Sequence, residues 1–146
     1  MKFLLDTHTI LFWLSDDDRL GPKARELIAD PANDVLVSAA SLWEIVVKTP
    51  IGKLKADIGE ILEASERSGF LPLGIEPAHL AALASLPAHH RDPFDHLLIA
   101  QAIAERAIFI SDDKNAPKYP LQRVPCSGRT RPASRPRPVS RPRQER

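Results

Sequence analysis

Short apolar runs alternate with longer segments of helical periodicity along most of this chain. The apolar runs are bounded by turn and cap residues and predict buried strands, at residues 2–6, 35–37, 70–73, 108–110 and, more weakly, 122–125. The longer segments repeat apolar residues at helical spacing and predict helices, at residues 7–14, 22–29, 39–48, 57–67, 77–86 and 93–103. This alternation favours an α/β fold in which a central parallel sheet is covered on both faces. The pattern does not give the order of the strands.

Several predicted helices begin at recognisable cap residues. Asp6, Ser38 and Asp92 each stand directly before a helix, where a side-chain oxygen can accept a hydrogen bond from the first turn. Pro22 and Pro93 occupy the first helical position, where a missing N–H costs nothing. These residues therefore mark where the helices are expected to begin.

Acidic residues gather at or soon after these junctions. They are Asp6, Glu44, Asp95 and the pair Asp112-Asp113. Taken singly, each has an ordinary structural role: a helix cap, an i,i+4 pair of Glu44 with Lys48, a charge that suits the helix dipole, or a turn. Taken together they favour a site, because the carboxyl ends of parallel strands converge on one crevice.

Converging carboxylates repel one another, so a divalent cation is the natural occupant of such a site. Carboxylate oxygens without a Cys/His ligand set favour Mg²⁺, with Mn²⁺ as the alternative, over Zn²⁺. Such an ion can activate a water molecule and bind phosphoryl oxygens. The acidic pattern therefore predicts hydrolysis of a phosphoester.

Four stretches resemble, in order, the acidic motifs of PIN-domain ribonucleases of the VapC toxin type. They read MKFLLDTH at 1–8, SAASLWEI at 38–45, HRDPFDHLLIAQA at 90–102 and ISDD at 110–113. The resemblance covers roughly residues 1–124 and implies a three-layer α/β/α fold. It also implies an Mg²⁺-dependent endoribonuclease, the toxin of a toxin–antitoxin pair, whose partners would be an RNA substrate, a VapB-like antitoxin and a second copy of the chain.

The same resemblance implies which residues bind the metal and carry catalysis. The acids of the family correspond to Asp6, Glu44 and Asp95 in this sequence. A Ser/Thr-x-Asp pattern puts the fourth acid at Asp113, and the neighbouring Asp112 could take its place.

The composition changes sharply near the C-terminus. Residues 127–146 contain seven Arg and one Glu, a net charge of +6, and the total of +1 then leaves −5 on the first 126 residues. Arg-Pro pairs recur in this segment, which is too poor in apolar residues to form a core. We therefore expect a PIN nuclease domain at 1–126 and a disordered tail at 127–146, which is either an accidental extension or a nucleic-acid-binding arm.

Two other features bear on where in the cell the protein is expected. The chain has no run of about 18 apolar residues, so no membrane span is expected, and its N-terminus does not resemble a secretory signal. Cys126 is the only cysteine and excludes an intrachain disulfide. These features predict a cytoplasmic protein.

Two other functions would also suit a strand-end aspartate or a basic tail. A haloacid dehalogenase-type phosphatase needs an Asp-x-Asp motif after its first strand, but His8 stands two residues after Asp6. The remaining alternative is a non-catalytic PIN-like module that binds RNA through its basic tail. Loss of one of the acids would indicate such a module, and because all four are present the catalytic interpretation is favoured.

Overall fold

The computed structural model describes residues 1–52, 55–88 and 92–127. Its strands are β1 (Lys2–Leu5), β2 (Asp34–Ser38), β3 (Leu71–Leu73), β4 (Ile108–Ile110) and β5 (Arg123–Val124). Its helices are α1 (Thr7–Leu14), α2 (Pro22–Ala29), α3 (Ala39–Lys48), α4 (Ile58–Arg67), α5 (Pro77–Ser85) and α6 (Pro93–Glu105), with a 3₁₀ helix, η1, at Ala116–Lys118. Every predicted strand and helix is present within two residues of its expected bounds. The predicted tail lies outside the described residues from position 128 onward.

The five strands form one parallel sheet in the order β3-β2-β1-β4-β5. The first strand of the chain is therefore the central one, with β2 on one side and β4 on the other. From β1 the chain first extends the sheet in one direction and then crosses back to extend it in the other. In parallel sheets of this kind, ligand-binding sites form at the carboxyl ends of the two strands between which the chain reverses its direction across the sheet.

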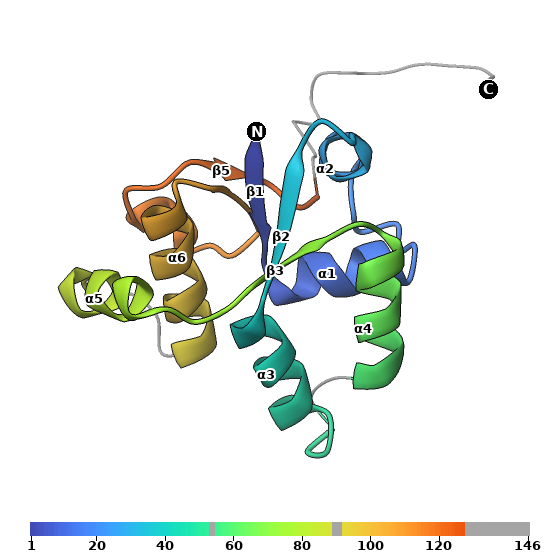
Figure 1. Cartoon of the computed structure of the whole chain (residues 1–146), viewed down its shortest axis with the longest axis horizontal. Helices are drawn as coiled ribbons and strands as arrows, with labels where there is room; N and C mark the ends of the chain where they lie inside the picture. The colour runs from blue at the N-terminus through green and yellow to red at the C-terminus, as the bar shows by residue number, and fades with distance from the viewer. Residues whose placement is uncertain (53–54, 89–91, 128–146) are drawn as a thin grey trace.

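Helices cover both faces of the sheet, so the predicted three-layer α/β/α architecture is confirmed. Figure 1 shows α1, α2 and α4 on one side of the strands and α5 and α6 on the other. Side chains of β1 alternate between the two layers: Phe3 and Leu5 join the core beneath α1 and α2, while Leu4 joins the core beneath α6. Because β1 is buried on both faces, its sequence is a continuous apolar run and not an alternating one.

A buried polar network connects the sheet to α5 and α6. The side chain of Gln101 accepts a hydrogen bond from the Ser38 hydroxyl and donates to the Gly74 carbonyl at 3.2 Å. Beside it, His79 Nδ1 accepts from the backbone N–H of Glu76 at 2.9 Å, and His79 Nε2 lies 2.8 Å from a Glu105 carboxylate oxygen. Ser38 also caps α3, so this network fixes the start of α3 relative to α6.

Within the described part of the chain, no helix has the length and apolar character needed to cross a membrane.

Candidate active site

Asp6 lies at the end of β1 and caps α1. Its Oδ1 accepts hydrogen bonds from the backbone N–H and the hydroxyl of Thr9, at 2.8 and 2.7 Å. The residue is only 9% exposed, and burial raises the pKa of its carboxyl group. Hydrogen bonds from Ser111 and Thr9 lower this pKa, but burial has the larger effect. Asp6 is thus a helix cap and also a buried carboxylate at the switch point of the sheet.

Glu44 projects from α3 into the interior between α1 and α6. One carboxylate oxygen accepts a hydrogen bond from the Thr7 hydroxyl, and the other accepts from Lys48 Nζ at 2.6 Å. The sequence allowed an i,i+4 pair of Glu44 with Lys48, which on most helices lies on an exposed face. The pair is present, but Glu44 is 2% exposed and the face is internal.

Replacing Thr7 with valine is expected to destabilise the metal-free protein by about 1.5–3 kcal/mol, because a hydrogen bond to a buried charged group is lost. Valine keeps the shape of the side chain but cannot donate to Glu44. Thr7→Ser retains the hydroxyl and is the matched control. Chemical denaturation of the three proteins measures the difference, and equal stability of the valine and serine variants would contradict this role for the hydroxyl.

The carboxylates converge on Asp95, in the first turn of α6. Its pKa is raised to about 7, first by burial and then by the charges of Asp92, Glu44, Asp113 and Asp6. Three residues predicted from the sequence therefore surround the fourth closely enough to oppose its ionisation. This is the electrostatic effect expected where several carboxylates converge.

The two alternatives for the fourth acid occupy different environments. Asp113 is partly buried, accepts a hydrogen bond from the N–H of Asn115 at 2.9 Å, and is one of the charges that raise the pKa of Asp95. Asp112 is exposed, and both of its oxygens lie 3.1 Å from the backbone nitrogen of Ser127. Of the two residues, Asp113 is therefore the one whose charge acts on the carboxyl group of Asp95.

Asp92 joins the cluster although the sequence indicated only a capping role. It does cap α6, through a 2.9 Å hydrogen bond from the N–H of Phe94, and its second oxygen accepts from Lys48 Nζ at 2.9 Å. Oxygens of Glu44, Asp92 and Asp95 all lie within 4.8 Å of one another, close enough to hold one ion. Burial raises the pKa of Asp92, but the hydrogen bonds from Lys48 and Phe94 outweigh burial and hold it below the ordinary value.

A pocket of about 490 Å³ opens onto this cluster. Its walls are formed by Asp6, His8, Phe12, Arg19, Asp95, Asp112, Asp113, Cys126 and Ser127. The position of Cys126 was not foreseen, because only the placement of β5 beside β4 brings it here. Burial, followed by nearby acids, raises the pKa of its thiol to about 11, and a protonated thiol is a poor metal ligand. The ionisable donors of the pocket are thus mainly carboxylates, which suit Mg²⁺ or Mn²⁺.

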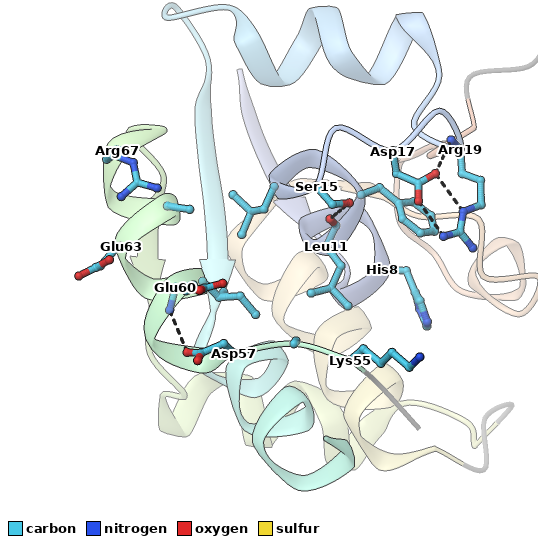
Figure 2. Close-up of a pocket in the computed structure, with 15 residues that line it drawn as sticks. His8, Leu11, Ser15, Asp17, Arg19, Lys55, Asp57, Glu60, Glu63 and Arg67 are labelled. Carbon is cyan, nitrogen blue, oxygen red and sulfur yellow. Dashed lines mark hydrogen bonds and ion pairs between the residues drawn. The ribbon is translucent and has the colours of Figure 1, made fainter. Parts of the chain in front are cut away.

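A larger groove of about 760 Å³ lies beside the pocket, between α1 and α4 (Figure 2). His8, Phe12 and Arg19 line both hollows. Figure 2 shows charged side chains of α4, among them Glu60 and Arg67, along the opposite wall. A ligand lying in this groove would therefore pass directly beside the acidic pocket.

Comparison with known proteins places this arrangement in a family. The family model of the PIN domain matches residues 3–121. The chain belongs to the PIN domain family. The match includes all the acids described above and confirms the family resemblance drawn from the four acidic motifs.

The similar proteins include a ribonuclease and a solved structure of a complex. The chain is 34% identical over 62 residues to Ribonuclease VapC16 of Mycobacterium tuberculosis (strain ATCC 25618 / H37Rv), a match that spans 40% of this chain and 44% of that relative. The fold is similar to the crystal structure of VapBC2 from Rickettsia felis bound to a DNA fragment from their promoter, with a TM-score of 0.67 and 18% identity. That alignment covers 86% of this chain and 98% of the other. At this identity the second likeness concerns the fold alone.

Proposed function

We propose that this PIN protein is a metal-dependent endoribonuclease, the toxin of a toxin–antitoxin pair. The observation that carries the proposal is the convergence of Asp6, Glu44 and Asp113 on Asp95. Burial, followed by the charges of Asp92 and these three acids, raises the pKa of Asp95 to about 7. A cluster in which carboxylates oppose one another's ionisation is costly unless a cation is present. The likeness to a protein named as a ribonuclease supports the choice of RNA as substrate.

The residues of the chain supply the ligands and their orientation. Asp6, Asp95 and Asp113 face the pocket and would hold Mg²⁺ or Mn²⁺. Glu44, the fourth predicted acid, lies within 4.8 Å of Asp95 and would add its negative charge to the site. Thr9 fixes the carboxylate of Asp6 through two hydrogen bonds. When bound, the ion would activate a water molecule and stabilise the charge that develops on a phosphodiester.

The affinity for Mg²⁺ is expected to fall about tenfold between pH 8 and pH 6. The pKa of Asp95 is about 7 in the metal-free protein, so the proton and the ion compete for this carboxylate below pH 7. Calorimetric titration at the two pH values measures the change, and the release of a proton at pH 7 can be read from buffers of different ionisation enthalpy. An affinity independent of pH, with the fold intact, would remove Asp95 from the ligand set.

The nuclease itself is tested with purified protein and total RNA in Mg²⁺ or EDTA. Cleavage in Mg²⁺ that EDTA abolishes is the expected result, and mapping the cut ends would identify the RNA. The alternative, a non-catalytic RNA-binding module, would bind RNA equally well with and without Mg²⁺ and leave it intact.

We further propose that the partner is a VapB-like antitoxin that occupies the groove between α1 and α4. This groove shares three wall residues with the acidic pocket, so a peptide lying in it can extend an arginine to the carboxylates. Co-purification from the native operon, followed by an arginine scan of the partner, tests the contact. Inhibition that survives replacement of every arginine would contradict it.

Homodimerisation is also part of the proposal. Trp43, Val46 and Val47 of α3 are 53%, 50% and 42% exposed, an unusual set of large apolar side chains for a surface helix. Sedimentation velocity of the purified protein distinguishes a dimer from a monomer.

A further inference from the structure

Lys48, the last residue of α3, places its ammonium group inside the acidic cluster. Nζ donates to Glu44 Oε2 at 2.6 Å and to Asp92 Oδ2 at 2.9 Å, and the side chain is 21% exposed. The ring of Phe94 lies 5.7 Å from Nζ. The ammonium is therefore a firmly held positive charge.

The two carboxylates that bind Lys48 belong to the group that could bind a metal ion. Glu44, Asp92 and Asp95 offer oxygens that lie within 4.8 Å of one another. Nucleases that use two metal ions hold them about 3.5–4 Å apart. The ammonium thus lies between Glu44 and Asp92 and takes the place that an ion held by both carboxylates would need.

The remaining oxygens of these two residues also have partners. Glu44 accepts from the Thr7 hydroxyl through its other oxygen, and Asp92 accepts from the N–H of Phe94. All four oxygens of the pair are therefore in hydrogen bonds. Asp6, Asp95 and Asp113 line the open volume of the pocket.

We infer that Lys48 is a built-in cation that restricts the site to a single divalent metal ion by holding Glu44 and Asp92 in an ion pair. The inference rests on the metal site of the proposed function and adds to it the number of ions. Lys48 acts in it as a positioning residue, through the carboxylates it binds. Lysine suits the role because its ammonium is a compact point charge with several donors.

The test counts Mn²⁺ ions bound per chain, by calorimetry and by electron paramagnetic resonance of free Mn²⁺. Wild type is expected to bind one ion. Lys48→Met removes the charge and keeps a chain of similar length, and Lys48→Gln removes the charge but keeps a hydrogen-bond donor. Both variants are expected to bind a second ion, whereas Lys48→Arg, which retains the cation, is expected to bind one.

Lys23→Met is the matched control, because it removes the same charge from an exposed position on α2 and should leave the count at one. An unchanged count and affinity in a folded Lys48→Gln protein would overturn the inference and leave the metal site standing. Two ions in wild type would overturn it as well. Wild type that binds no Mn²⁺ would overturn the proposed metal-dependent function, and the inference with it.

Discussion

Asp95→Asn is expected to abolish RNA cleavage and at the same time raise the melting temperature of the metal-free protein. Asparagine has nearly the same shape as aspartate, but it lacks the charge that burial and four neighbouring carboxylates oppose. Removing that charge relieves repulsion in the folded state and weakens the ligand set for the ion. Addition of Mg²⁺ should therefore stabilise the variant less than the wild type. Thermal unfolding in EDTA and in Mg²⁺, together with an RNA cleavage assay, measures both effects.

The stabilising effect of Asp95→Asn should be larger at pH 8 than at pH 5. The pKa of Asp95 is about 7 in the folded protein against an ordinary value of 3.8, so the folded state binds the proton more tightly than the unfolded state. Stability of the metal-free wild type therefore falls as pH rises through this window, and asparagine does not titrate. Asp18→Asn, at an exposed position, is the control. Full cleavage by the Asp95→Asn protein would refute the assignment of the site.

The second large effect is expected from Gln101→Leu, at a position that makes no contact with the proposed ligands. Leucine fills a similar volume but leaves the Ser38 hydroxyl and the Gly74 carbonyl without their buried partner. Each such group costs roughly 1–3 kcal/mol, so the melting temperature should fall by several degrees. Thermal and chemical unfolding measure the loss.

Gln122→Leu makes the same chemical change at an exposed position and should alter stability by about 0.5 kcal/mol or less. Mg²⁺ should stabilise the folded Gln101→Leu protein as strongly as wild type, because the acidic cluster is intact. A stable Gln101→Leu protein would mean that the network does not hold α3 against α6.

The elements of this fold could be predicted because their signals are local. Asp6, Ser38 and Asp92 all cap the helices expected of them, and each accepts a hydrogen bond from the first turn. The order of the strands could not be predicted, because β1 and β4 pair across more than a hundred residues and no local signal marks their register.

The structure brings the predicted acids together, but the sequence did not predict the cation that lies among them. A pair of Glu44 with Lys48 follows from helical spacing, but the second contact of Lys48, to Asp92, joins residues 44 positions apart. Capping α6 was enough to account for Asp92 in the sequence, so its position in the acidic cluster beside Asp95 was not predicted. Cys126 lies on the pocket wall for a similar reason, since the pairing of β5 with β4 alone brings it there.

The central position of β1 bears on how the protein is made. Asp6 is synthesised well before Asp95 and Asp113, but its strand, β1, gains its neighbour on one side only when β4 pairs with it. Asp95 and Asp113, which precede and follow β4, reach the pocket at the same late stage. The carboxylate cluster of a nascent chain is therefore incomplete until most of the domain has been translated. The proposed nuclease cannot become active beside ribosomal RNA before that stage.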